Sequence, residues 1–221
     1  KQMQVIIDLL QQQMEETKEK DAEDLFQDVS DEDDSEQASG KITGATNSGD
    51  VSGDVNVAGI VGSMSVEYDF DPEDDLTRDG TRSLDFQYKT LAVVAGCTNE
   101  GNVSAKKDYA GGIVGRMDLG AVKSCESYGS VESYSGDYVG GIAGLSRATI
   151  RGCFVKCVLS GGDYVGGVTG ATAENTVVSG CYTLVDIPDS GRYSGAVSGT
   201  EDGNITGNYY VSDTLAGLGR I

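Results

Sequence analysis

Four cysteines recur at one constant interval, and this interval constrains the fold more than any other feature of the chain. Cys97, Cys125, Cys153 and Cys181 each begin a segment that ends in a glycine-rich block. The blocks read NVAGIVG (56–62), YAGGIVG (109–115), YVGGIAG (138–144), YVGGVTG (164–170) and YSGAVSG (193–199). A fixed period of this length is typical of stacked units that form a solenoid or an array.

Each unit contains short alternating runs separated by Gly, Ser, Asn and Asp, which is typical of strands and turns rather than helices. One position of each block is always Ile or Val, and the next position varies more. Strand alternation predicts that the first column faces the core and the second faces outward. We therefore expect an all-β fold, a parallel β-helix or solenoid of about five 28-residue coils.

Two segments depart from the repeat. Apolar residues at helical spacing over residues 1 to about 27, extended by Leu25 and Phe26, predict an N-terminal α-helix. It could cap the open end of the solenoid or form the tail of a longer coiled coil. We place this helix and an acidic linker at 1–38 and the repeat domain at 39–221. Ala45 stands in the cysteine place of the first unit, almost two periods before Cys97, which indicates an insertion at 65–89.

Charge and composition exclude several classes of function. The formal charge is −20, and residues 1–36 alone hold 13 acidic and 3 basic residues, or −10. Such acidity disfavours nucleic acid and anionic membrane as partners. The sequence has no run of 18 apolar residues, so it predicts no membrane-spanning helix. Histidine is absent, so the chain can form neither a Ser-His or Cys-His nucleophile pair nor an HExxH zinc site.

The repeated block, which follows C-x3-[GCV]-x-[VLI], resembles the GLUG motif over about residues 41–211. That motif recurs in bacterial surface proteins, including the region before the catalytic domain of immunoglobulin-A-cleaving metallopeptidases. The resemblance implies a β-helical repeat domain of a secreted or cell-surface protein, extracellular and from a Gram-positive bacterium. The peptidase domain, whose zinc ligands include histidine, is absent from this sequence, so the resemblance implies no catalytic residue.

The five cysteines could form disulfides, but their spacing favours a buried column of free thiols. Cysteines one coil apart lie on adjacent parallel strands and point the same way, which orients them poorly for a disulfide. Cysteine also packs well as a small apolar residue. Cys157 takes the place held by Gly49, Gly101 and Gly129, and we expect its exposure to differ from that of the others.

Two groups of acidic residues are weak candidates for a Ca²⁺ site, because this ion accepts clustered carboxylate oxygens. Asp108, Asp137 and Asp163 each precede a block tyrosine and would stack in one column, with Arg192 in the next coil. Aspartate is also a common turn residue before a strand, so a purely structural role stays open. The insertion adds Asp69, Asp71 and Glu73, although the Gly and Glu of an EF-hand are missing there.

The block tyrosines Tyr109, Tyr138, Tyr164 and Tyr193 predict a second column. With regular alternation they would share a face with the Ile/Val column and form an aromatic ladder. Alternatively, an exposed strip of tyrosines would bind a partner by stacking on sugar rings.

Together these features predict a non-catalytic stalk or adhesin at the bacterial cell surface, with protein or glycan partners and no cofactor apart from a possible Ca²⁺. Two alternatives remain open: an accessory repeat domain of a larger surface enzyme, and a carbohydrate-active β-solenoid. The second would need basic residues such as Arg116, Lys123 and Arg147 beside the aspartates. The oligomeric state is open.

Overall fold

The computed structural model describes residues 5, 7, 26–32, 38–66, 88–189 and 191–219. The chain divides into two compact units, one formed by residues 1–29 with 66–90 and the other by residues 30–65 with 91–221. We call the second the solenoid unit. Within the described residues, no helix is long and apolar enough to cross a membrane.

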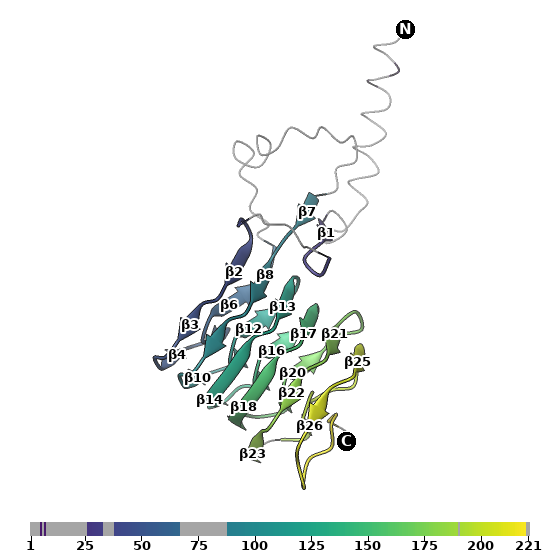
Figure 1. Cartoon of the computed structure of the whole chain (residues 1–221). Coiled ribbons are helices and arrows are strands. Elements are labelled where there is room, and N and C mark those ends of the chain that lie inside the picture. The colour runs from purple at the N-terminus through teal and green to yellow at the C-terminus, as the bar shows by residue number, and fades with distance from the viewer. Residues whose placement is uncertain are drawn as a thin grey trace. The chain divides into compact units, whose positions relative to one another are not determined.

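The strands of the solenoid unit are parallel and stack into four sheets, I to IV, in the order in which the chain visits them (Figure 1). Sheet I holds β2 (Lys41–Thr43), β8 (Val93–Ala95), β13 (Ala121–Lys123), β17 (Thr149–Arg151), β21 (Val177–Ser179) and β25 (Asn204–Thr206). Sheet II holds β3 (Thr46–Asn47), β4 (Val51–Gly53), β9 (Thr98–Asn99), β10 (Val103–Ala105), β14 (Glu126–Ser133), β18 (Phe154–Ser160), β22 (Tyr182–Thr183), β23 (Asp186–Asp189) and β26 (Tyr209–Tyr210).

The two remaining sheets are narrower. Sheet III holds β5 (Val57–Ala58), β11 (Ala110–Gly111), β15 (Val139–Gly140), β19 (Val165–Gly166) and β24 (Ser194–Gly195). Sheet IV holds β6 (Val61–Met64), β12 (Val114–Met117), β16 (Ala143–Ser146) and β20 (Thr169–Thr172). Four coils of the described chain therefore contribute to every sheet, and two shorter coils follow them. The predicted parallel β-solenoid is confirmed.

The register of sheet I reproduces the period of the sequence. Val93 pairs with Ala121, Ala121 with Thr149 and Thr149 with Val177, and each step equals one period of the cysteine repeat. The step from Lys41 to its partner Val93 is almost twice as long, because the connection from the first coil to the second is longer. Like residues therefore stack above like residues, as expected for identical coils about 4.8 Å apart.

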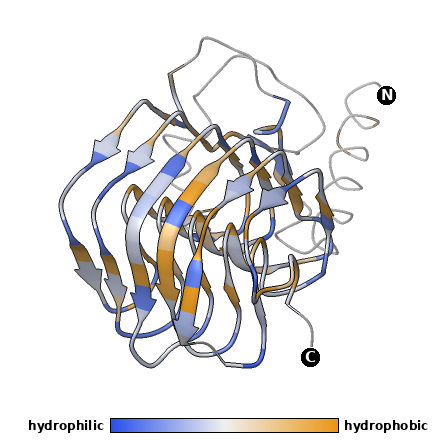
Figure 2. Ribbon diagram, turned by 60° about the horizontal axis from the view of Figure 1, so that its bottom comes forward, coloured by the Kyte–Doolittle hydropathy of each residue, from blue (hydrophilic) through white to orange (hydrophobic). Residues whose placement is uncertain are grey.

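The core consists of columns that run through the stack. Ile113, Ile142 and Val168 are fully buried and confirm the predicted inward column. Figure 2 shows one long ribbon that is hydrophobic over most of its length. In β18 the side chains of Val155, Cys157 and Leu159 are buried and the residues between them are exposed, as strand alternation requires. At the start of the stack a polar pair interrupts the core, where Nδ2 of Asn47 donates to Oδ1 of Asn99 at 2.7 Å and keeps the buried amide satisfied.

The prediction that the column after Ile/Val faces outward is wrong. Val114, Ala143 and Thr169 in that column are fully buried. The reason is a corner between sheets III and IV at which the alternation breaks. The N–H groups of two consecutive residues, Ile142 and Ala143, both donate to the carbonyl of Val168, at 2.9 and 3.0 Å. Both side chains of the corner can therefore point inward.

The N-terminal prediction is only partly covered by the described residues. Val5 and Ile7 have helical backbone, and the rest of residues 1–25 lies outside the described residues, so the cap and the coiled-coil tail both stay predictions. The helix does not extend to Phe26. Phe26–Asp28 forms β1, which pairs in parallel with β7 (Tyr88–Thr90), and pairing with a distant segment overrides the local helical spacing.

Candidate functional site

The aspartate column predicted from the sequence lies at the corner between sheets II and III. Oδ1 of Asp108 accepts the backbone N–H of Asp137 at 2.8 Å, and Oδ1 of Asp137 accepts that of Asp163 at 2.8 Å. Asp163 accepts the N–H of Arg192 and also pairs with its guanidinium at 3.1 Å. Each carboxylate thus accepts a backbone N–H of the next coil, which gives the aspartates a structural role.

Arg192, the last residue of this column, neutralises the negative charge of Asp163. The backbone amide of Arg192, followed by its guanidinium charge, holds the pKa of Asp163 below its ordinary value. No three His, Cys, Asp or Glu side chains among the described residues gather closely enough to hold a metal ion. Asp69, Asp71 and Glu73 lie outside the described residues, so a Ca²⁺ site that includes them stays a prediction.

The four tyrosines form a stacked ladder beside the aspartates. Ring centroids are 5.0 Å apart for Tyr109 and Tyr138, 4.9 Å for Tyr138 and Tyr164, and 4.6 Å for Tyr164 and Tyr193. The interplanar angles fall from 19° to 1° along this series. The rings of Tyr138 and Tyr164 are therefore covered on both faces, and their partly exposed edges are what a partner could reach.

These tyrosines do not share a face with the buried Ile/Val column, contrary to the prediction. Tyr109, Tyr138 and Tyr164 have φ angles of 68°, 66° and 64°, in the left-handed region. That conformation costs a bulky residue about 1–2 kcal/mol. It turns the chain at the corner and places the rings at the surface, where stacking offsets the cost. Burial, together with the neighbouring tyrosines and aspartates, raises the pKa of Tyr138.

The cysteine column is an element of the core. All five cysteines are free and buried, which confirms the predicted thiol ladder. The Sγ atoms donate weakly to carbonyl oxygens, as Cys125 does to Lys123 at 3.4 Å. Cys157 is only 4 % exposed, so the expectation that its exposure would differ is wrong: β18 is regular there, and position 157 points inward. Burial raises the pKa of Cys157 to about 11.

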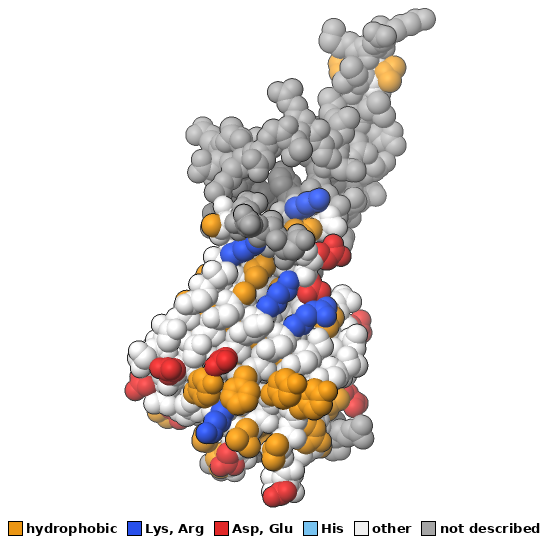
Figure 3. All heavy atoms as spheres, viewed as in Figure 1, with side chains coloured by type: hydrophobic (Ala, Val, Ile, Leu, Met, Phe, Trp, Pro, Cys, Tyr) orange, Lys and Arg blue, Asp and Glu red, His pale blue; other side chains and the backbone are white. Residues whose placement is uncertain are grey.

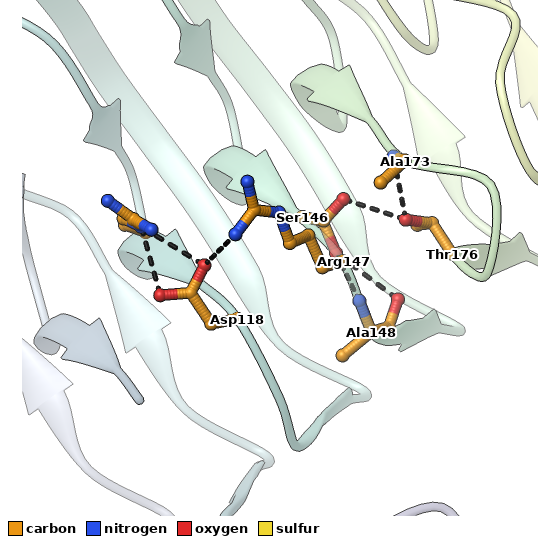
Figure 4. A network of polar contacts seen from close by, with 7 residues as sticks. Asp118, Ser146, Arg147, Ala148, Ala173 and Thr176 are labelled. Atoms are coloured by element: carbon orange, nitrogen blue, oxygen red, sulfur yellow. Dashed lines mark hydrogen bonds and ion pairs between the residues drawn. The ribbon is translucent and has the colours of Figure 1, made fainter. Parts of the chain in front are cut away.

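Of the basic residues that a carbohydrate-active site would need, Arg116 lies beside the columns, with its guanidinium over the ring of Tyr109 at 5.4 Å from the centroid. All three form ion pairs or hydrogen bonds. Arg116 and Arg147 both pair with Asp118, at 2.9 and 3.0 Å, after sheet IV (Figure 4). In the same network Oγ1 of Thr176 donates to the carbonyl of Ser146 at 2.7 Å. Lys123 donates to the carbonyl of Asp31 on the flank of sheet I. The contacts of Arg147 and Thr176 join neighbouring coils, and that of Lys123 joins sheet I to the segment before the first coil.

Sequence reasoning missed one surface, the outward face of the last coils of sheet II. We call it the apolar strip and define it by six exposed side chains: Phe154, Val158, Tyr182, Leu184, Tyr209 and Val211. Figure 3 shows hydrophobic side chains gathered in a row across this end of sheet II. The signal was present in the sequence, because these residues alternate with the inward positions of β18, β22 and β26.

A hollow of about 330 Å³ lies at the opposite end of sheet II and is lined mainly by polar residues, among them Asp54, Lys106 and Tyr134.

In comparisons with protein-family models, with curated proteins and with solved structures, nothing matches this chain.

Proposed function

We propose that this chain is a non-catalytic repeat module of a secreted or cell-surface bacterial protein, which acts as a stalk or adhesin for protein or glycan partners. The resemblance of its blocks to the GLUG motif supports the location. The parallel solenoid supports the mechanical role, because each coil contacts only its neighbours and the stack presents an extended surface.

The observation that carries the proposal is that the polar side chains of the columns bind other parts of the solenoid and so stabilise the fold. The carboxylates of Asp108, Asp137 and Asp163 hold the backbone of the next coil. The thiols are buried, and Arg116 and Arg147 are paired with Asp118. Groups engaged in this way stabilise the stack. In the apolar strip the rings of Tyr182 and Tyr209 also stack, with centroids 4.9 Å apart, but these side chains remain more than half exposed. A large exposed apolar patch on a protein surface marks an interaction site.

A binding screen tests this function. The purified chain would be applied to immobilised glycans and host matrix proteins, with and without Ca²⁺, beside a variant that lacks residues 65–89. Saturable binding supports an adhesin, and its loss with the insertion would place the site there. Absence of binding by both folded forms would contradict the adhesin and leave a structural spacer.

A further inference from the structure

The hollow on sheet II lies where small side chains in one outward column meet long ones in the next. Its lining residues are Ser52, Gly53, Asp54, Ser104, Lys106 and Tyr134. Ser52 pairs with Ser104 in register, and the N–H of Lys106 donates to the carbonyl of Gly53 at 3.1 Å. The N–H of Tyr134 donates to the carbonyl of Ala105 at 3.0 Å. Asp54, Lys106 and Tyr134 therefore stand side by side on three successive coils, beside the shorter serines.

The ring of Tyr134 gives the hollow an open aromatic surface. This residue is 76 % exposed, and within the described parts of the chain its ring stacks on no other ring. In the ladder, by contrast, the rings of Tyr138 and Tyr164 are covered on both faces. An uncovered aromatic face packs well against the apolar C–H groups of a sugar ring. The sugar stacking that the sequence suggested for the ladder therefore has a better place at Tyr134.

The polar groups around this ring include both donors and acceptors. Lys106 is exposed, and its ammonium forms no ion pair or hydrogen bond with the residues that the structure describes. Asp54 pairs with Lys107 at 2.8 Å, but it is more than half exposed and keeps free acceptor positions. Oγ of Ser104 donates to Oε1 of Glu132 at 2.6 Å, so its lone pairs are left to accept. This mixture suits hydroxyl groups, since each hydroxyl both donates and accepts.

Size and charge narrow the class of ligand. A volume of about 330 Å³ is at the lower end of the range for small-molecule sites, which suits one small ring rather than a long chain. The carboxylate of Asp54 lines the hollow, that of Glu132 lies beside Ser104, and the formal charge of the chain is −20. Negative charge of this kind repels an acidic sugar. A neutral sugar therefore fits better than a uronic acid.

We propose, resting on the glycan-binding function above, that the hollow binds a neutral pyranose unit of a glycan. The C–H face of the sugar packs on the ring of Tyr134, the ammonium of Lys106 donates to hydroxyl oxygens, and Asp54 and Ser104 accept hydroxyl protons. A few polar groups of this kind fix the orientation of a ligand that the ring holds.

A saturation-transfer NMR titration of the full chain tests the site, with the methyl pyranosides of glucose, galactose, mannose and N-acetylglucosamine as probes. We expect saturable binding of at least one, weakened about tenfold by Tyr134→Ala and preserved by Tyr134→Phe, which keeps the ring face. Lys106→Ala should also weaken it. The matched controls Tyr209→Ala and Lys156→Ala remove exposed side chains from the same sheet outside the hollow and should leave binding unchanged. Circular dichroism checks that each variant is folded.

Each contrary result has a distinct meaning. Absence of binding by all four pyranosides would overturn the site, and so would equal binding by the folded Tyr134→Ala variant. Methyl glucuronide that binds more tightly than methyl glucoside would overturn the choice of a neutral sugar. Failure of the pyranosides alongside saturable binding in the glycan and matrix-protein screen would reject this hollow and leave the proposed function standing. Failure of both experiments would contradict the adhesin as well.

Discussion

Gly141→Ala tests the close approach of successive coils most directly. A Cβ atom at position 141 would lie 2.3 Å from the carbonyl oxygen of Gly167 in the next coil and 2.3 Å from Cγ1 of Val155. Ordinary van der Waals contact begins at 3.4 Å, so both buried neighbours must move by about 1 Å relative to position 141. Overpacking of this kind costs about 3 kcal/mol.

The expected loss is measurable in two ways. Urea unfolding followed by circular dichroism should give a free energy of unfolding about 3 kcal/mol below that of the unmodified chain. For a chain of this size the same loss lowers Tm by about 6–12 °C. The backbone at position 141 adds no strain of its own, because φ at Gly141 is not in the left-handed region. The expected loss therefore comes from the overlap with the neighbouring atoms.

The chain supplies its own control in the same column. Position 196 of the shorter fifth coil is already an alanine, and its N–H donates to Ala216 at 2.7 Å. Ala196→Gly should lower stability by only about 0.5–1 kcal/mol, because it creates no overlap and its main cost is the greater backbone freedom of glycine. A urea midpoint of Gly141→Ala equal to that of the unmodified chain would refute the steric reasoning. Equal losses in the two variants would refute it as well.

Three further predictions concern the polar and thiol columns. Asp137→Ala should cost about 1–2 kcal/mol in urea unfolding, because the N–H of Asp163 loses its acceptor, and Asp137→Asn should recover most of that loss. Because the pKa of Asp163 is lowered, its stabilisation is present above pH 3.8, the ordinary value, and is lost as pH falls through the lower folded pKa. Asp163→Asn should therefore flatten the acid limb of a stability–pH curve, and an unchanged limb would contradict this. Burial of all five thiols predicts that none reacts with a thiol reagent at pH 8 until the chain unfolds, and for Cys157 the raised pKa acts in the same direction. Rapid reaction of the folded chain would contradict the buried ladder.

The solenoid could be predicted from the sequence because its period is repeated in each coil. Cys125 and Cys153 lie one period apart in the sequence and one coil apart in the structure, since stacking places equivalent residues in one column. The aspartate and tyrosine columns followed from the same rule. The contacts within these columns could not be predicted. They depend on the backbone at the corners between sheets, such as the left-handed φ of Tyr138 and the shared carbonyl of Val168, which strand alternation does not reveal.

The apolar strip was missed for a related reason. Phe154, Tyr182 and Tyr209 belong to one column, but earlier coils hold Thr98 and Glu126 there, so no repeated motif marks it. A repeat search detects what stays constant from coil to coil, and a binding surface can depend on what changes. Alternation within β18 and β22 would have revealed the exposed positions once the inward cysteine column was fixed.

The long connection between the first two coils has a consequence for engineering. In sequence, the first and second coils are almost twice as far apart as later neighbouring coils are. The longer connection does not disturb the stack, because β6 pairs with β12 in the same way as β12 pairs with β16. A loop of that length closes at small entropic cost. The equivalent connections at 118–120, 147–148 and 173–176 should therefore accept grafted peptides or small domains. One cargo per molecule, grafted into one coil or another, could then be positioned along one edge in steps of about 4.8 Å, because domains on adjacent coils would overlap.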